Sequence, residues 1–246
     1  MTPEARLDWL RGRLRDDGSV TITEAVDTLG ASGMTIRRDL ATLEALGEAR
    51  RVRGGARALG PSPFVARSPL NAKAKVAIAE KLLAMVPATG AIALDSSSTM
   101  ACLANLLHSA TDLVVVTNGL EAFEALQGRP GIRAVLTGGE RDPRTSSLVG
   151  PAALASVAAF RFDVSFLSSA AVDADHGALE ATPEEAAIDE ALAHRGRRVV
   201  LGADSSKLGG PAAMVGLRWA DVDLLVTELV PHAERLAALR DVVELG

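Results

Sequence analysis

Hydrophobic residues recur at helical spacing in three short segments near the start of the chain. Segment 3–18 carries leucines three and four residues apart and ends at a glycine. Segment 21–30 is predicted to begin at an N-cap, Thr23, and segment 32–47 at another, Ser32. The few residues between the second and third segments match the connection of a helix-turn-helix.

Two short segments follow on either side of Gly54 and Gly55. Paired glycines in such a position indicate a β-hairpin. Three helices and a hairpin together make the winged form of the helix-turn-helix, which we predict for residues 1–60. Three prolines then interrupt the pattern, and we predict a linker over residues 61–72.

From residue 73 onward, a helical segment is followed by six apolar runs that alternate with four more helical segments. The runs span residues 91–95, 113–118, 132–139, 163–167, 197–204 and 222–228. Runs that are apolar throughout are typical of strands buried on both faces, so they indicate a mostly parallel sheet covered by helices. The predicted fold class is α/β: the winged helix-turn-helix, then a mostly parallel α/β domain over residues 73–246.

The composition argues against several classes of function. Hydrophobic residues make up 48% of the chain, which supports a real core, but only 3% are aromatic and tyrosine is absent. An aromatic platform for stacking bases or sugars is therefore not expected. The single cysteine, Cys102, and four scattered histidines lack metal-ligand spacing, so we expect neither metal nor cofactor. Without a long apolar run, we expect no membrane contact and a soluble, cytoplasmic protein.

Charge is distributed unevenly. The chain has a formal net charge of −5, but residues 1–60 carry 10 Arg against 9 acidic residues. Residues 31–60 alone carry 6 Arg against 3 acidic residues. The local excess is entirely arginine, which suits a surface that binds an anionic partner such as DNA.

The third predicted helix has a core stripe and a distinct outer face. With Ile36 at the origin of a helical wheel, Leu40 and Leu43, and more loosely Leu46, share its side, while Arg38 lies nearly opposite. The outer face is short-chained enough to enter a major groove about 12 Å wide. Candidate DNA contacts, including two in the hairpin, are Ser32, Met34, Thr35, Arg37, Arg38, Arg51 and Arg53. Arg50 and Arg57 add positive charge to the hairpin. The alternative is an ordinary solvated helix face.

The stretch SGMTIRRDLATLEALGEARRVRGGA resembles the winged helix-turn-helix of the DeoR family, whose signature centres on TIRRDL and a Gly-Gly wing. Arg53 stands where that family usually has histidine. The segments LDSSST, VVTNGL, LTGGE, LVGP, EEAAIDEAL and ADSSK then follow in the order of the DeoR C-terminal domain. That domain is similar in fold to ribose-5-phosphate isomerase. The resemblance implies a homo-oligomeric repressor that binds double-stranded operator DNA under the control of a phosphorylated sugar or a related metabolite.

Strand ends suggest where such an effector would bind. Hydroxyls and free amides converge where residues 96–99 enter a helix, which favours an anion, although a simple helix cap is the alternative. The loops after other predicted strands add small residues and a lysine. Candidate effector contacts are Asp95, Ser96, Ser97, Ser98, Thr99, Asn118, Gly138, Gly139 and Lys207. Glu184 and Glu185 lie in the first turn of a helix, where the helix dipole alone can account for them.

Two departures from the family pattern bear on effector identity. Ala170 and Ala171 stand where an acidic, glycine-containing segment is usual, and Asp189 stands where a basic residue is usual. The alternative function is a sugar-phosphate isomerase with an N-terminal appendage, which Asp204 and Lys207 keep open. The missing acid at Ala170 counts against that alternative, because isomerisation needs a carboxylate base. We expect no catalytic residues. A pure interaction module would explain neither the hairpin arginines nor the strand-end loops.

Overall fold

The computed structural model describes residues 1–46, 48–58, 63–142, 145–210 and 212–246. These residues form two compact units, Met1–Pro69 and Leu70–Gly246. Residues 61 and 62 of the predicted linker lie outside the described residues. Its remainder contains a short helix, α4 (Phe64–Arg67), and the start of α5 (Ala72–Leu83). The domain limits given above stay a prediction.

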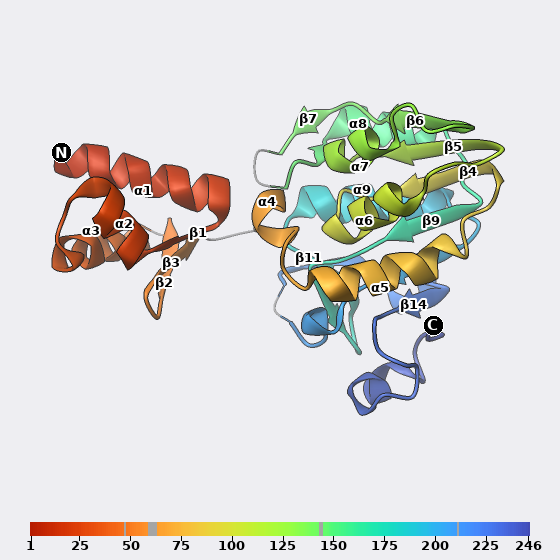
Figure 1. The fold of residues 1–246 in the computed structure, drawn as a ribbon. Helices are drawn as coiled ribbons and strands as arrows, with labels where there is room; N and C mark the ends of the chain where they lie inside the picture. The colour runs from red at the N-terminus through yellow and green to blue at the C-terminus, as the bar shows by residue number, and fades with distance from the viewer. Residues whose placement is uncertain (47, 59–62, 143–144, 211) are drawn as a thin grey trace. The chain divides into compact units, whose positions relative to one another are not determined.

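Besides the short helix α4, the described part of the N-terminal unit contains three longer helices and a three-stranded sheet (Figure 1). The helices are α1 (Pro3–Asp17), α2 (Ile22–Leu29) and α3 (Gly33–Ala45). The strands are β1 (Ser19–Thr21), β2 (Ala49–Val52) and β3 (Gly55–Ala58), in the antiparallel order β1-β3-β2. The predicted helices and hairpin are confirmed. The short strand β1 was missed, because three residues carry no readable alternation.

The apolar stripes of these helices meet in one core. Leu10 and Leu14 of α1 are buried against Ile36, Leu40 and Leu43 of α3 and the core side of the sheet. Trp9 packs at the edge of this core, with the Arg13 guanidinium 5.9 Å from the centroid of its ring.

Two details of the predicted helices were wrong. Helix α2 is capped by Thr21, whose side chain accepts a hydrogen bond from the Glu24 N–H, rather than by Thr23. Leu46 is 59% exposed, because α3 ends at Ala45 and Leu46 is its C-cap residue. The predicted stop at Gly47 lies outside the described residues.

The C-terminal unit is built on a six-stranded parallel sheet. Its strands are β4 (Thr89–Leu94), β5 (Asp112–Thr117), β6 (Ile132–Leu136), β9 (Val164–Leu167), β12 (Val199–Gly202) and β14 (Leu224–Val226). The order is β14-β12-β9-β4-β5-β6, with every neighbouring pair parallel. Each strand falls on one of the six predicted apolar runs, so the predicted α/β class is confirmed.

Helices cover both faces of this sheet (Figure 1). Helices α5, α6 (Ser98–Leu106) and α7 (Leu120–Leu126) contribute to the core on one face. Helices α8 (Pro151–Ala158) and α9 (Pro183–Arg195) contribute to the core on the other. Buried strand residues alternate between the two cores, as the pleat requires.

Two small antiparallel sheets were not predicted. One joins β10 (Ala171–Asp173), β11 (Gly177–Glu180) and β13 (Met214–Leu217), and the other joins β7 (Glu140–Arg141) to β8 (Leu148–Val149). The 3₁₀ turns are η1 (Ser205–Lys207), η2 (Trp219–Asp221) and η3 (Glu234–Leu239).

The second tryptophan lies in η2, where its indole N–H donates to the carbonyls of Asp173 and Ala174, both at 3.0 Å. Across the described part of the chain, no helix combines the length and apolar character needed to span a bilayer.

The strand order indicates where on the sheet a ligand would bind. The chain builds β4, β5 and β6 outward in one direction and then returns to place β9 on the other side of β4. Open α/β sheets bind ligands at the carboxyl ends of the strands where the order reverses in this way. The ends of β4 and β9 are therefore the first place to look for a ligand site.

Candidate functional site

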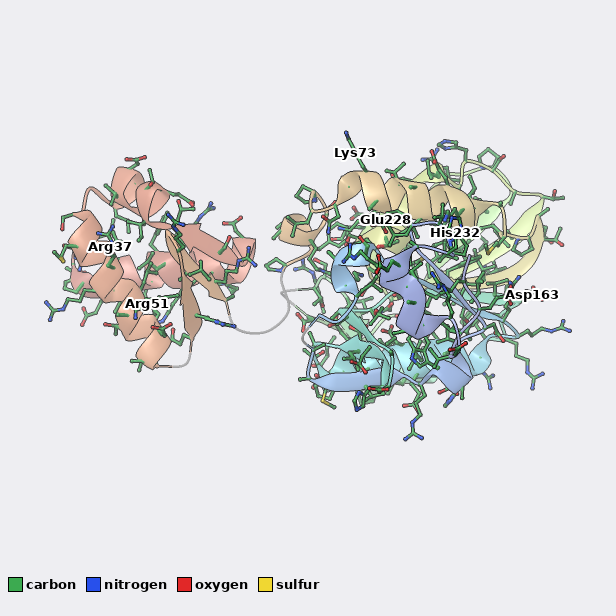
Figure 2. The ribbon with its side chains drawn as sticks, turned by 90° about the horizontal axis from the view of Figure 1, so that it is seen from below. Arg37, Arg51, Lys73, Asp163, Glu228 and His232 are labelled. Atoms are coloured by element: carbon green, nitrogen blue, oxygen red, sulfur yellow. The ribbon has the colours of Figure 1, made fainter. Side chains whose placement is uncertain are left out.

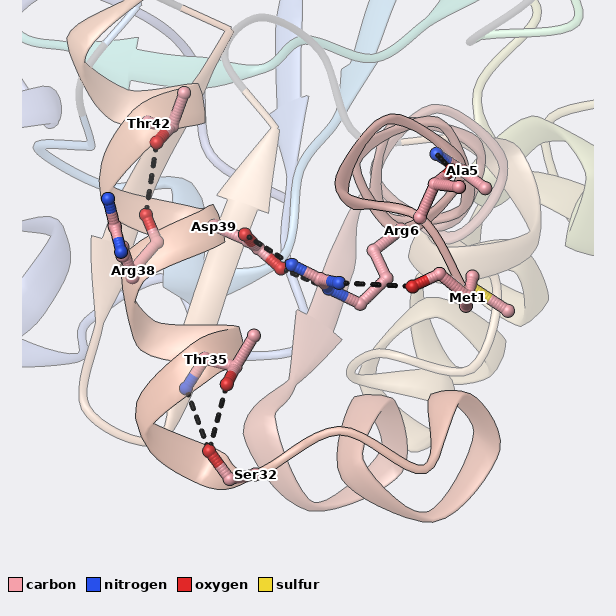
Figure 3. A network of polar contacts seen from close by, with 9 residues as sticks. Met1, Ala5, Arg6, Ser32, Thr35, Arg38, Asp39 and Thr42 are labelled. Carbon is pink, nitrogen blue, oxygen red and sulfur yellow. Dashed lines mark hydrogen bonds and ion pairs between the residues drawn. The ribbon is translucent and has the colours of Figure 1, made fainter.

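Helix α3 is held at its N-terminus by two candidate residues. Ser32 caps the helix: its Oγ accepts a hydrogen bond from the Thr35 N–H at 3.2 Å and lies 2.9 Å from Thr35 Oγ1 (Figure 3). This cap fixes the start of α3 directly after the turn that follows α2. Both hydroxyls stay at the surface, where they remain open to a partner.

The outer face of α3 carries exposed, unpaired side chains. Met34 is 78% exposed, and Arg37 and Arg38 are exposed as well. Within the described ranges, neither guanidinium makes a hydrogen bond or an ion pair. Thr42 Oγ1 donates to the Arg38 carbonyl at 3.2 Å, a bond that uses the backbone and leaves the Arg38 side chain free. The expected outer face of α3 is thus exposed as the helical wheel indicated.

A bidentate ion pair joins the inner side of α3 to α1. Arg6 Nε donates to Asp39 Oδ2 at 2.8 Å, and Arg6 Nη2 donates to Asp39 Oδ1 at 3.3 Å (Figure 3). The two side chains are only 13% and 10% exposed. The hydrogen bond to Asp39 raises the pKa of Arg6 above its usual value. Because Asp39 directly follows Arg38 in the chain, this pair helps to set the angle at which α3 presents its arginines.

The β2–β3 hairpin carries arginines in two different situations. Arg51 is tied down: its backbone N–H and its Nε donate to the two carboxylate oxygens of Glu44 on α3, at 2.9 Å and 2.5 Å. The hydrogen bond from the Arg51 N–H is the largest cause of the lowered pKa of Glu44. Arg53 is exposed beside the turn. Figure 2 labels Arg37 and Arg51 on this unit.

Arg50 and Arg57 lie directly opposite each other in the β2–β3 register. Both are exposed, and no ion pair of either is found among the described residues. Like charges directly opposite on one face of a sheet destabilise it. An anion such as a phosphate relieves this repulsion. The sequence indicated Arg50 and Arg57 as positive charge of the hairpin, but neither was among the candidate DNA contacts.

In the C-terminal unit, Asp95 joins the ends of β4 and β9. One of its carboxylate oxygens accepts from the Ser97 N–H at 2.8 Å, and the other accepts a short hydrogen bond from the Ser168 N–H. Ser97 in turn caps α6 by accepting from the Met100 N–H at 3.1 Å. Burial raises the pKa of Asp95, while these hydrogen bonds and the charge of Lys207 oppose the rise.

Lys207 reaches this network from the loop after β12. Its Nζ donates to Ser168 Oγ at 2.8 Å, and Ser168 Oγ donates to the Gly202 carbonyl at 2.6 Å. The structure thus gathers Asp95, Ser97 and Lys207 around the point where the strand order reverses, as the strand-end loops suggested.

The remaining candidate residues lie on neighbouring loops. Asn118 Nδ2 donates to the Leu148 carbonyl at 3.3 Å, and a side chain at Gly119 would meet Ser96 Cα at 2.7 Å, so the loops after β4 and β5 touch. Gly138 and Gly139 are exposed beyond β6, both with positive φ. Ser98 and Thr99 are buried in the first turn of α6.

Three buried polar atoms near these strand ends have no hydrogen-bond partner in the described part of the chain. They are Thr99 Oγ1, Asn118 Oδ1 and Ser169 Oγ. Buried polar atoms are rarely left unsatisfied without a reason.

A group of buried carboxylates approaches the same strand ends from β11 and α9. Glu180 Oε1 accepts from the Ala170 N–H at 3.2 Å, so a carboxylate does lie against Ala170, although the sequence has none at that position. Burial, and next the charge of Glu185, raise the pKa of Glu180 to about 8. Burial and the charges of Glu180 and Asp95 raise the pKa of Asp189 well above its usual value, and Asp189 is hydrogen-bonded to Glu180.

The sequence did not indicate Glu180 as a site residue, and it indicated only a helix-dipole role for Glu185. Glu184 is exposed, in keeping with a dipole role, but Glu185 is buried beside the other carboxylates. A burial pattern on α9 could have separated the two, since Glu185 shares a face with the apolar Ile188. Among the described residues, no three His, Cys, Asp or Glu side chains gather as metal ligands would.

Comparison with known protein families matches both units. Residues 6–61 match the DeoR-like helix-turn-helix domain, and residues 70–229 match the DeoR C terminal sensor domain. The two matches together span most of the chain.

Several relatives align with most of this chain and with most of their own length. An uncharacterized HTH-type transcriptional regulator FruR from Bacillus subtilis is 33% identical, over 85% of this chain and 84% of its own. The glycerol-3-phosphate regulon repressor of Escherichia coli is 29% identical over 93% and 92%. The HTH-type transcriptional repressor CsqR of Escherichia coli is 28% identical over 98% and 94%.

Solved structures resemble the chain more distantly. A D-ribose-5-phosphate isomerase in complex with phospho-erythronic acid has a TM-score of 0.41 and 16% identity, over 55% of this chain and 52% of its own. An eIF2B delta structure from Chaetomium thermophilum has a TM-score of 0.45 and 15% identity, over 65% and 58%. Likenesses at this level carry no argument about activity.

Proposed function

The chain belongs to the DeoR family of transcriptional repressors, and from that premise we propose that it represses transcription by binding operator DNA through α3 and the β2–β3 hairpin. The observation that carries the proposal is the pair Arg37 and Arg38 on the outer face of a capped helix that follows a tight turn. Both are exposed, and neither side chain has a partner among the residues that the structure describes. A recognition helix placed in this way reads base edges with its N-terminal residues.

Within this proposal the arginines have different roles. Arg38, nearly opposite the core stripe, contacts bases, since arginine pairs bidentately with guanine in the major groove. Arg37 on the flank, with Arg50, Arg53 and Arg57 in the hairpin, contacts phosphates. Arg51 holds the hairpin against α3 through Glu44 and adds less net charge to the DNA surface than its position in the sequence suggested.

A helix-turn-helix reader of this kind usually binds paired half-sites, so we propose a homo-oligomer of at least two chains. The test is an anisotropy titration of double-stranded DNA from the promoter region of the protein's own gene, competed with shuffled DNA of equal length. Preferential, salt-dependent binding supports the proposal. Equal binding to both DNAs at every salt concentration would sink it.

We further propose that a small phosphorylated metabolite binds at the ends of β4 and β9 and modulates operator affinity. The support is the convergence of Asp95, Ser97 and Lys207 at the reversal of the strand order. Lys207 and the first backbone N–H groups of α6 bind the anionic group of the metabolite. Asp95 and Asn118 accept hydrogen bonds from its hydroxyl groups.

The test is a thermal-shift screen of the full chain against pentose, hexose and triose phosphates. A ligand that binds only the folded state raises the unfolding midpoint, and Lys207→Ala should reduce that shift. If the site regulates DNA binding, a ligand found in this way also changes operator affinity, and operator DNA then changes the affinity for that ligand by the same factor. A ligand that raises the midpoint and leaves operator affinity unchanged would count against the regulatory part.

The isomerase alternative receives less support. The relatives described above are named as transcriptional regulators and repressors, and their similarity covers most of the chain. Turnover of any of the screened phosphates by the purified chain would revive it.

A further inference from the structure

Asn71 has an unusual position and unusual bonding. It is the N-cap residue of α5, two residues after the last residue of the N-terminal unit, Pro69. Its backbone is left-handed, with φ 53° and ψ 32°, whereas an N-cap residue ordinarily has extended backbone. Asparagine is one of the few residues that visit this region readily.

The Asn71 side chain does not cap its own helix. Asn71 Nδ2 instead donates to Asp204 Oδ1 at 3.0 Å and to Ser206 Oγ at 2.8 Å. Both acceptors belong to the loop after β12, more than 130 residues away in the chain. The side chain therefore makes a long-range contact instead of capping the helix, which is the ordinary role of an asparagine at this position.

The loop that Asn71 holds is the one that carries Lys207. Asp204 and η1 form a single tight turn: the Lys207 N–H donates to the Asp204 carbonyl at 3.0 Å, and the Ser206 N–H donates to Asp204 Oδ1 at 3.1 Å. Asp204 is buried just after the end of β12. Because these hydrogen bonds join Lys207 to Asp204 and Asp204 to Ser206, a displacement of Lys207 should also move Asp204 and Ser206.

The observed arrangement of Asn71 differs from the one that an N-cap asparagine ordinarily adopts. In the arrangement observed, the side chain holds the η1 turn and the backbone is left-handed. In the other, the backbone is extended and the side chain accepts from the first turn of α5, as N-cap asparagines ordinarily do. The two differ in the direction in which residues 69 and 70 leave α5. A residue with two such discrete arrangements is the kind of element that couples two sites.

We propose that Asn71 is a positioning residue that couples the ligand site at Lys207 to the segment leading to the N-terminal unit. The inference rests on the proposed function, since it assigns the route by which the effector site and operator binding influence each other. Ligand at Lys207 biases the η1 turn, the turn biases the arrangement of Asn71, and Asn71 sets the path of the chain toward α4.

Reciprocity allows a test without the effector. If operator binding and the η1 turn are linked, operator DNA must change the opening of that turn. The amides of Ser205, Ser206 and Lys207 are all hydrogen-bonded, so their hydrogen exchange reports on it. We expect operator DNA to change their exchange rates in the full-length protein by at least about fivefold, the lower end of typical allosteric coupling.

The variants separate the side chain from the backbone. Asn71→Gly tolerates the left-handed backbone but removes the contact, and Ser206→Ala removes one acceptor from the other side of the contact. Each should still bind operator DNA and should lose most of the DNA-dependent change in exchange. Asn105→Ala is the matched control, since among the described residues the Asn105 side chain donates only to the Ala101 carbonyl within its own helix. It should behave like the unchanged protein.

The outcomes are distinct. If the unchanged protein binds no operator DNA, the proposed function fails and this inference fails with it. If operator DNA is bound but exchange at the η1 turn does not change in the unchanged protein, the proposed function stands and the coupling role of Asn71 is wrong. The same conclusion follows if exchange changes as much in Asn71→Gly and Ser206→Ala as in the unchanged protein.

Discussion

Arg37 and Arg38 are adjacent in the chain but point in different directions from α3, so their substitutions should not be equivalent. We expect Arg38→Ala to weaken operator binding by about 1–3 kcal/mol and to relax the preference at one base position. Arg37→Ala should weaken binding to operator and shuffled DNA alike and make the salt dependence shallower by about one phosphate contact. Anisotropy titrations against both DNAs at several salt concentrations measure all of these effects.

A control for this pair is Arg197→Ala. Arg197 is an exposed arginine of the C-terminal unit, and its Nη1 lies 3.9 Å from Asp163 Oδ1. It should leave operator binding unchanged. Identical behaviour of Arg37→Ala and Arg38→Ala would contradict the assignment of one to phosphate and the other to base.

The buried carboxylates predict a pH-dependent stability. The pKa of Glu180 is about 8 in the folded chain, against 4.5 as its ordinary value, so folding takes up a proton between these pH values. Glu180 therefore contributes stability that is complete below about pH 4.5 and is lost as pH rises through about 8. We expect the urea midpoint of the C-terminal unit to fall over this range.

Glu180→Gln removes the titrating group and keeps its shape, so it should flatten that decline. Glu184→Gln, an exposed neighbour of the same cluster in sequence, should leave the decline as it is. An equal pH slope in the unchanged protein and in Glu180→Gln would show that another group is responsible.

At the scale of single residues, the sequence predicted the apolar contacts better than the polar ones. Ile36, Leu40 and Leu43 were assigned to the core from their spacing alone, because a helix repeats locally. The pairs Arg6–Asp39 and Glu180–Asp189 were not foreseen. Each depends on which elements pack together, and a sequence read one segment at a time does not contain that information.

At the scale of elements, the cap of α3 has both a structural and a functional role. Ser32→Ala removes the acceptor for the Thr35 N–H and should lower the unfolding free energy of the N-terminal unit by about 1 kcal/mol. Ser32→Asp keeps a capping oxygen and should restore stability. Its negative charge would face DNA phosphates, so operator affinity should remain low.

Urea unfolding and operator titration of the same two variants separate these roles. If Ser32→Asp regains operator affinity together with stability, Ser32 acts only as a cap and is not near the DNA.

The six strands of the large sheet were predicted because each is a run of apolar residues between helical segments. The small sheets of β7–β8 and β10–β11–β13 were missed because their strands are two to four residues long and mostly lack an apolar run. The order of the strands in the sheet could not be predicted from the sequence either. It depends on the side of the sheet to which each connection carries the next strand. The convergence of Asp95 with Ser168, 73 residues apart, became visible only with that order.

At the scale of the whole molecule, the distribution of arginines predicts the salt dependence of DNA binding. If Arg37, Arg50, Arg53 and Arg57 each neutralise one phosphate, the slope of log K against log salt is about −3.6 per chain. A dimer on two half-sites should then show a slope of about −7. A slope near that of a single chain, measured at concentrations where sedimentation shows a dimer, would mean that only one winged unit is engaged.

The two tryptophans offer a further consequence. The chain has no tyrosine, and its tryptophans are divided between the units: Trp9 at the edge of the N-terminal core and Trp219 in η2 of the C-terminal unit. The protein therefore carries one intrinsic fluorophore for each of its proposed tasks. Trp219→Phe would leave an emission spectrum that reports on the DNA-binding unit alone, and Trp9→Phe one that reports on the ligand-binding unit. Operator and effector could then be followed separately in one solution without an added label.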